Sequence, residues 1–178
     1  LETHAGAGIY NLKGVPAQKT QEFSQGIEKL AKSADRFAEL STVNRYLAAV
    51  KKAGYPAHYP GSPWLVREWI RPVDSLVLIE KHPETLQSLR ACFKADRQVA
   101  IHDRDAYEGL SALLPLKQGR GLILIDPAYE VTDEWARLVT ALEKAIPRYR
   151  QGIFVIWYPI KAGSSWEKET VSLRARLP

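Results

Sequence analysis

Methionine is absent from this sequence of 178 residues, and cysteine occurs only once. The single thiol, Cys92, excludes an internal disulfide and any metal site built from several thiolates, and it is typical of a protein from a reducing compartment. No apolar run approaches the roughly 20 residues that cross a bilayer, and no signal-peptide pattern is present. These absences predict a cytoplasmic protein without a membrane partner. Because the chain begins at Leu1 and contains no methionine, we also expect it to lack parts of its full gene product.

The sequence also lacks a recognisable set of metal ligands, and its composition is not extreme in any residue class. The four histidines are isolated and do not combine with the single cysteine into a recognisable ligand set, so we predict no metal site. With 46% hydrophobic and 25% charged residues, the composition is that of an ordinary globular protein, and the length suits one domain with or without an inserted subdomain. The formal net charge of +5 favours a polyanionic partner such as nucleic acid, although many basic proteins bind none. We expect a monomer.

A helical pattern covers the stretch from Lys19 to Lys52, where apolar residues recur at spacings of three and four. This pattern predicts two or three short helices. Residues 53–63 follow as a loop rich in proline and glycine. Ser62 followed by Pro63 is typical of an N-cap and the first turn of another helix.

The rest of the chain alternates between short apolar stretches and helical patterns. The apolar stretches are continuous rather than alternating, which is typical of parallel strands covered by helices on both faces. The opening letters LETHAGAG indicate the end of a further strand and a glycine turn. We therefore predict an α/β fold, with a doubly wound, mostly parallel sheet and a small helical insertion after the first strand. The expected strands are residues 75–80, 98–103, 121–126 and 152–159, the expected helices are 82–96, 106–114 and 133–146, the core is 1–14 and 57–178, and the insertion is 15–56.

Carboxylates follow the expected strands at the edge where an open parallel sheet binds ligands. Glu80 could accept hydrogen bonds from the two hydroxyls of a ribose, or it could interact with the dipole of the next helix. Asp105 could bind an adenine amine or cap the helix that follows it. Gly6 and Gly8 would let a ligand approach the backbone closely, but many strand-to-helix turns use such glycines. A dinucleotide fingerprint needs a third glycine where Asn11 stands, which disfavours a hydride-transfer enzyme.

The stretch GLILIDPAYE ends an expected strand in an aspartate, a proline and a tyrosine. An exocyclic adenine amine is a poor nucleophile because its lone pair is delocalised into the ring. The Asp126 carboxylate and the Pro127 carbonyl would accept its two N–H groups and align the nitrogen with an electrophilic carbon. The Tyr129 ring would stack on the base after the base leaves its helix. The motif therefore indicates chemistry at an adenine amine.

Six motifs occur in an order and at spacings that resemble the bacterial 23S ribosomal RNA adenine-N6 methyltransferase family, also described as a competence-related group linked to the use of external DNA. They are THAGAG, YPGSP, LIEKHP, the D-A pair in HDRDAYEGL, GLILIDPAYE and IFVIWYP. The resemblance runs from residue 2 to about residue 161. It implies a Rossmann-like class I methyltransferase that uses S-adenosylmethionine, with 23S ribosomal RNA rather than the finished ribosome as its partner.

The resemblance also implies roles for individual residues. Asp126 matches the catalytic aspartate of the family's D-P-P-Y motif, Pro127 its first proline, and Tyr129 its base-stacking aromatic. The residues expected to contact the methyl donor are His4, Ser62, Glu80, Asp105 and Ala106, together with Gly6 and Gly8 of the glycine turn. Without the resemblance, His4 would be interpreted as a turn or core histidine and Ser62 as a helix cap. The residues expected to hold RNA phosphates, although solvated helix faces look the same, are Lys51, Lys52, Arg67 and Arg71.

The sequence departs from the family in several places. Ala128 replaces the second proline of the motif, Glu2 stands where aspartate is common, and the family's N-terminal segment has no counterpart. The stretch after Pro159 is short before VSLRARLP, residues 171–178, which resembles a later strand; we expect a segment to be missing between them. Two other functions stay open, namely methylation of a DNA adenine and non-catalytic nucleic-acid binding connected with DNA uptake.

Overall fold

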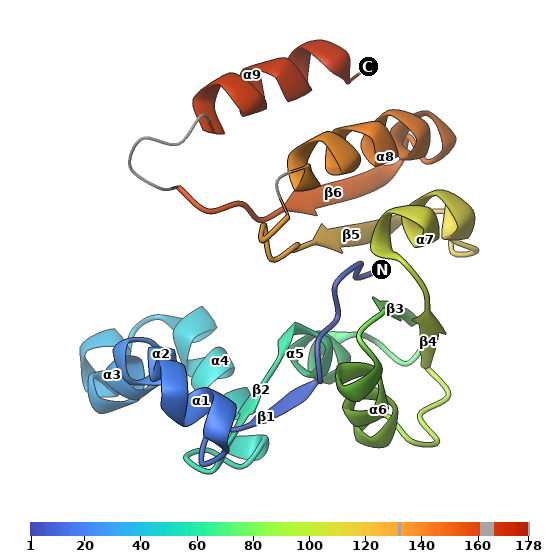
Figure 1. Cartoon of the computed structure of the whole chain (residues 1–178). Helices are drawn as coiled ribbons and strands as arrows, with labels where there is room; N and C mark the ends of the chain where they lie inside the picture. Colours follow the sequence, from blue (N-terminus) through green and yellow to red (C-terminus); the bar gives the residue numbers. More distant parts are fainter. Residues whose placement is uncertain (132, 161–165, 178) are drawn as a thin grey trace.

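A mostly parallel sheet forms the centre of the computed structural model, which describes residues 1–131, 133–160 and 166–177 (Figure 1). Its strands are β3 (Leu76–Glu80), β4 (Val99–Asp103), β5 (Gly121–Ile125) and β6 (Gly152–Ile156). β3 pairs in parallel with β4, and β5 pairs in parallel with β6. The N-terminal segment lies between the two pairs, because Glu2 forms parallel bridges to Leu78 and to Leu124. This placement confirms that the opening residues form the end of a strand.

Helices cover both faces of β3. The helices of the core are α5 (Ser62–Trp69), α6 (Pro83–Cys92), α7 (Ala106–Leu113) and α8 (Glu134–Arg148), and the last helix, α9 (Trp166–Arg176), lies outside α8. Successive side chains of a strand point to opposite faces. Ile79 therefore packs with Leu110 of α7 and Leu138 of α8, while Leu78 packs with Leu89 of α6. The α/β prediction with helices on both faces is confirmed at this strand.

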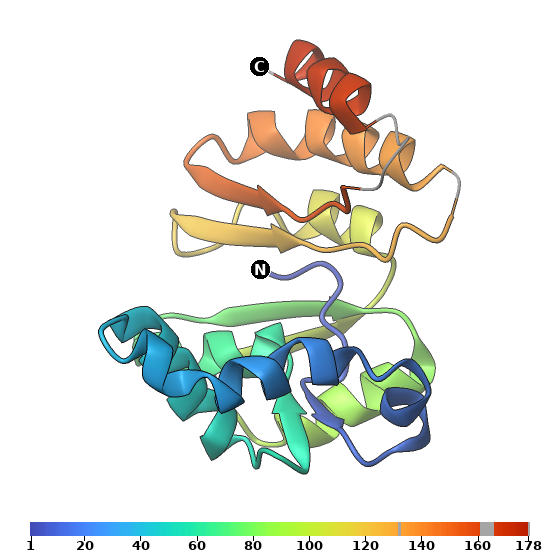
Figure 2. The same cartoon turned by 90° about the vertical axis from the view of Figure 1, so that its left-hand side faces the viewer.

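The β5–β6 pair is covered on one face only within the described residues. Ile123 and Ile125 of β5 are fully buried against α7 and α8. Figure 2 shows α8 lying over this pair and α9 lying outside α8. On the opposite face Leu122, Ile153 and Val155 are 50%, 60% and 40% exposed. An apolar strip of the sheet is therefore open to solvent on that side.

The predicted helical insertion is a group of short helices beside the core (Figures 1 and 2). They are α1 (Val15–Thr20), α2 (Glu22–Gln25), α3 (Ile27–Lys32), the 3-10 helix η1 (Ala34–Phe37) and α4 (Ser41–Lys52). Two short strands, β1 (Ile9–Asn11) and β2 (His58–Pro60), precede and follow these helices in the sequence and pair with each other antiparallel. The interpretation of residues 53–63 as loop was wrong for β2, because its pairing partner lies far away in the sequence and leaves no local signal.

The last element also differs from its prediction. Residues 171–178 resemble a strand in sequence, but the chain forms α9 there. Leu173 and Leu177, one helical turn apart, pack against the cluster beneath α8, and the Arg176 guanidinium pairs with the Glu143 carboxylate at 2.8 and 2.9 Å. Helical spacing therefore explains the apolar residues better than strand alternation. No helix of the described residues is long and apolar enough to span a membrane.

Candidate functional site

The carboxyl ends of the parallel strands bring together four of the predicted donor-binding residues. They line one cavity of 110 Å³, which also includes Thr3, Tyr107, Glu134 and Arg137. Parallel strands end at the same edge of a sheet, so turns that are distant in sequence meet there. The four predicted residues in this cavity are His4, Glu80, Asp105 and Ala106.

Glu80, the last residue of β3, accepts backbone hydrogen bonds with both carboxylate oxygens. Gly6 N donates to Oε2 at 2.9 Å, and His82 N donates to Oε1 at 2.8 Å. The second bond joins Glu80 to the residue before α6, as expected for an acid at a helix N-terminus. Each carboxylate oxygen keeps a further acceptor position, so binding to ribose hydroxyls stays a prediction.

The glycine turn requires glycine at its first position. Gly6 has φ 69° and Gly8 has φ 81°, both in the left-handed region that side chains disfavour. A Cβ at Gly6 would also collide with the Tyr10 hydroxyl, which accepts a hydrogen bond from Ala7 N at 3.3 Å. The turn is thus a cradle with no room for a side chain, directly bonded to Glu80.

Asp105 caps α7, which is one of its two predicted roles. Its Oδ1 accepts from Tyr107 N at 3.0 Å and Glu108 N at 3.3 Å, and its Oδ2 accepts from the Arg137 guanidinium at 2.9 Å. Burial works against ionisation of Asp105, but these donors outweigh it and hold its pKa below the ordinary value. Asp105 therefore presents a fixed negative charge at the cavity, and contact with an adenine amine stays a prediction.

His4 belongs to a buried network that sequence reasoning missed. Its ring lies edge-on to Tyr107 at 5.7 Å between centroids, and burial lowers its pKa, which favours the neutral form. The Tyr107 hydroxyl donates to Glu134 Oε1 at 2.5 Å, and the Arg137 guanidinium lies 4.9 Å from the Tyr107 ring. One signal was available: Glu134 falls on the same helical stripe as the buried Leu138, where an acid is unusual.

Ser62 does not cap α5, and that prediction was wrong. Gly61 is the N-cap residue, and the Ser62 hydroxyl donates instead to Glu2 Oε1. Glu2 is only 2% exposed, and its Oε2 has no hydrogen-bond partner among the described residues. Burial raises the pKa of Glu2 to about 7, partly offset by the Ser62 bond. Ser62 is not among the residues that line the 110 Å³ cavity. Its bond to Glu2 joins α5 to the N-terminal segment between the two strand pairs.

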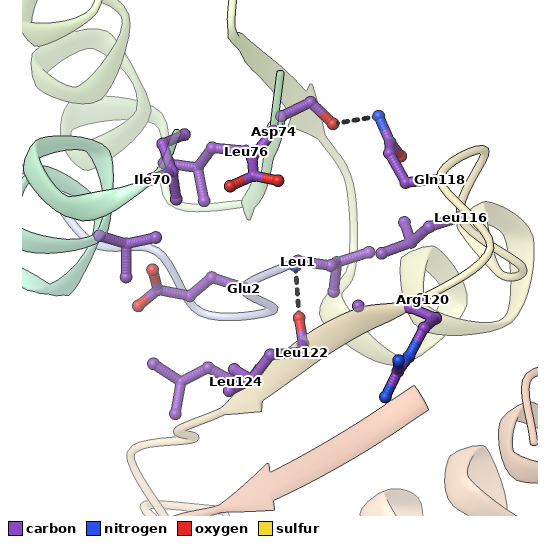
Figure 3. A pocket seen from close by; sticks show the side chains of 13 residues that line it. Leu1, Glu2, Ile70, Asp74, Leu76, Leu116, Gln118, Arg120, Leu122 and Leu124 are labelled. Carbon is purple, nitrogen blue, oxygen red and sulfur yellow. Dashed lines mark hydrogen bonds between the residues drawn. The ribbon is translucent and has the colours of Figure 1, made fainter. Parts of the chain in front are cut away.

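Glu2 also borders a larger cavity at the opposite end of the strands. This cavity of 360 Å³ lies near the starts of β3 and β5, and Asp126 is not among the residues that line it (Figure 3). Figure 3 shows Glu2 between Leu124 on one side and Ile70 and Leu76 on the other. The apolar surroundings account for the raised pKa of this carboxyl, because they cannot replace the water lost by its charged form.

The free energy of unfolding should therefore depend on pH through Glu2. A folded-state pKa of about 7, above the ordinary 4.5, means that the contribution is full below pH 4.5 and is lost as pH rises through 7. We expect urea unfolding of Glu2→Gln to lack this loss, with a difference from the wild type of up to about 3 kcal/mol between the two limits. Glu22→Gln, at an exposed acid of α2, is the control. Identical pH profiles for the wild type and Glu2→Gln would contradict the assignment.

Asp126 follows β5 and is exposed, whereas Pro127 is buried. Loss of hydration at the strand end raises the pKa of Asp126 above its ordinary value. Trp157 N donates to the Ile125 carbonyl at 3.0 Å, so the pairing of β5 with β6 continues up to the motif. Asp126 therefore directly follows an inner strand of the sheet, at the point where the pairing with β6 ends.

Tyr129 is held close to this aspartate in an unusual conformation. Its φ of 54° is left-handed, which is rare for a tyrosine. Its hydroxyl donates to the Trp157 carbonyl at 2.9 Å, and its ring is 6.4 Å from that of Trp135. Burial, then the charge of Asp126, raises the pKa of Tyr129 to about 12, so the hydroxyl stays protonated as a donor. The half-buried ring is therefore positioned by its own hydrogen bond.

The four predicted phosphate-binding residues lie on α4, on α5 and just after α5. Arg67 pairs with Asp96 at 2.6 Å, Lys52 with Glu68 at 2.6 Å, and Arg71 with Asp74 at 2.8 Å. Within the parts of the chain that the structure describes, Lys51 is the only one of the four without a recorded ion pair, and it is exposed. Phosphate binding by Arg67, Lys52 and Arg71 would compete with these pairs.

The comparisons of this chain with known proteins agree on one family. A family model described as "Ribosomal RNA large subunit methyltransferase D, RlmJ" matches residues 1–175. Ribosomal RNA large subunit methyltransferase J of Escherichia coli (strain K12) is 37% identical over 160 residues, and the protein of the same name from Haemophilus influenzae is 35% identical over 164. Each match covers 90% of this chain, and the chain spans 57% of the length of either relative.

A solved structure supports the same conclusion about the fold. The crystal structure of a protein from Legionella pneumophila str. Philadelphia 1 has a TM-score of 0.83 to this chain at 30% sequence identity. The match covers 99% of this chain and 63% of that protein.

Proposed function

The chain belongs to the ribosomal RNA large subunit methyltransferase family described as RlmJ, and from this premise we propose that it transfers a methyl group from S-adenosylmethionine to the N6 amine of an adenine in 23S ribosomal RNA. The observation that carries the proposal is the position of Asp126, exposed at the end of β5 with the Tyr129 ring fixed beside it. In this proposal the fold is a Rossmann-like class I methyltransferase. Residues 1–14 and 57–178 form its core, and residues 15–56 form a helical insertion subdomain.

The residues at the strand ends fit a nucleoside-bearing methyl donor. The turn at Gly6 excludes a side chain and holds Glu80 through the Gly6 N–H, and Glu80 keeps acceptor positions suited to ribose hydroxyls. S-adenosylmethionine, when bound, supplies an electrophilic methyl group. The residues that would hold it are His4, Gly6, Gly8, Ser62, Glu80, Asp105 and Ala106.

The D-P-x-Y motif would orient the acceptor. The Asp126 carboxylate accepts one N–H of the adenine amine and the Pro127 carbonyl accepts the other, which turns the nitrogen lone pair out of conjugation with the ring. These acceptors would also stabilise the positive charge that develops on nitrogen as the methyl leaves the donor's sulfur, and the methylated nitrogen then loses one N–H proton to solvent. Tyr129 stacks on the base once it has left its helix. Ala128, in place of a second proline, removes one constraint from this turn but neither of the two acceptors.

The proposed partner is 23S ribosomal RNA before assembly into the finished ribosome, and we propose that the protein acts on it as a monomer in the cytoplasm. A flipped adenine must be reached from a strand that is not locked in packed RNA. The net charge of +5 suits a polyanion, and exposed Lys51 is the best placed of the four basic residues to meet a phosphate.

Transfer of tritiated methyl from S-adenosylmethionine to unmodified 23S ribosomal RNA, followed by nucleoside analysis, tests this function. We expect labelled N6-methyladenosine from RNA and none from DNA of the same sequence. Label in DNA would support a DNA adenine methyltransferase instead. Nucleic-acid binding without transfer, and without any effect of the donor, would support a non-catalytic protein.

A further inference from the structure

Trp157 exposes its indole beside the proposed acceptor site, and the mechanism above makes no use of that side chain. It directly follows β6 and is 54% exposed. The bond from Trp157 N to the Ile125 carbonyl places it opposite Asp126 in the continued strand pairing. Ile125 is fully buried, and side chains alternate along a strand, so Asp126 and Trp157 both point to the uncovered face of the sheet. Neighbouring strands lie about 4.8 Å apart, which makes the two residues direct neighbours.

The Tyr129 ring and the indole are arranged as two separate surfaces. Tyr129 donates its hydroxyl to the Trp157 carbonyl, which fixes the tyrosine ring relative to the end of β6. The two ring centroids are 6.5 Å apart, and the ring planes are inclined by 45°. A base that lies flat on Tyr129 cannot also lie flat on Trp157. The indole face is therefore left for a different base.

An adenine that leaves its stack deprives the adjacent bases of a stacking partner, and this loss opposes extrusion. An exposed aromatic face next to the extruded base offsets the loss, whatever the identity of the neighbouring base. We infer that Trp157 stacks on the nucleobase next to the target adenine. This inference rests on the proposed function and adds a residue that positions its RNA substrate.

If a protein segment rather than a nucleobase covered this face, substitutions on it would have different effects. Ile153 and Val155 are exposed on the same face of β6, so a protein segment that covered the whole face would contact them together with Trp157. A stacked nucleobase contacts only the end of the strand. Ile153, near the start of β6 and 60% exposed, is therefore the matched control.

The experiment compares the wild type with Trp157→Ala, Trp157→Phe and Ile153→Ala. The probes are a short single-stranded oligoadenylate with 2-aminopurine at one position, and 23S ribosomal RNA in the methyl-transfer assay. We expect Trp157→Ala to weaken oligoadenylate binding and raise the KM for RNA by about ten- to a hundredfold, with kcat and donor affinity unchanged. Trp157→Phe should keep most of the affinity, and Ile153→Ala should match the wild type. Quenching of 2-aminopurine by the protein should be lost in Trp157→Ala.

The outcomes separate this inference from the proposed function. Normal methyl transfer with an unchanged KM in Trp157→Ala would overturn the stacking role and leave the function intact. Equal losses of thermal stability and RNA affinity in Trp157→Ala and Ile153→Ala would show that a protein segment covers this face, and this result would also overturn the stacking role. If Trp157→Ala does not fold, Trp157→Phe decides, because a phenyl ring that restores neither binding nor quenching contradicts stacking. A wild type that neither binds oligoadenylate nor transfers methyl would remove both proposals.

Discussion

Asp126→Asn is expected to lower methyl transfer by about a thousandfold, while the affinity for S-adenosylmethionine stays within about twofold of the wild type. The size is that found when one preorganised polar group aimed at developing charge is removed. Asparagine keeps the shape, but it removes the negative charge and can turn an N–H group toward the amine. The 110 Å³ cavity proposed to bind the donor is lined by other residues, so donor affinity should not follow the loss. Single-turnover transfer and calorimetric titration of the donor measure the two quantities.

The pH profile gives a second test of the same residue. Asp126 must be ionised to accept both its hydrogen bond and the developing charge, so transfer should fall as pH falls through its raised pKa, with a midpoint above the ordinary 3.8. The control is Asp103→Asn, at the exposed end of β4, where the carboxylate faces Arg90 at 3.9 Å and is outside the proposed site. Equal effects of the two substitutions, or full turnover by Asp126→Asn, would show that Asp126 has no role in the reaction.

Much of the fold follows from patterns that are local in sequence. Continuous apolar runs identify β3, which is buried between helices on both faces. They also identify β5 and β6, although one face of that pair is exposed within the described residues at Leu122, Ile153 and Val155. The misses are contacts between distant segments. β1 and β2 have three residues each, and their pairing joins segments that the whole helical insertion separates in the sequence. α9 was mistaken for a strand because its apolar residues are few, and its position depends on Leu173 and on the pairing of Arg176 with α8.

Site residues that follow a strand directly could be predicted from the sequence, whereas contacts between distant segments could not. Strand-end acids such as Glu80 and Asp126 could be located because parallel strands present their carboxyl ends at one edge. The pair of Tyr107 and Glu134 joins two helices across 27 residues, and the bond from Ser62 to Glu2 spans 60. No motif encodes such pairs. Sequence alone therefore predicts which residues reach the edge, but not which of them neutralise or orient one another.

Glu80→Gln is expected to weaken binding of S-adenosylmethionine by at least about tenfold and to lower the melting temperature. Both oxygens of Glu80 accept backbone N–H groups, from Gly6 and from His82. A glutamine can satisfy only one of them, because its NH₂ group faces the other N–H donor to donor. The penalty of about 1–3 kcal/mol for a fully buried unsatisfied group is an upper limit here, because Glu80 is only partly buried. The glycine turn should therefore loosen, and the proposed ribose contact would lose its charge as well.

The matched control for this prediction is Glu84→Gln, at an exposed acid in the first turn of α6. It makes the same chemical change near the same helix N-terminus without touching the glycine turn. If Glu80 only stabilised α6 by interacting with the helix dipole, both substitutions would lower the melting temperature slightly and leave donor affinity unchanged. If Glu80 holds the turn against the donor, Glu80→Gln alone should reduce the affinity. Calorimetric titration of the donor with the two variants distinguishes these roles, since the helix dipole is common to both and the bond to Gly6 belongs to Glu80.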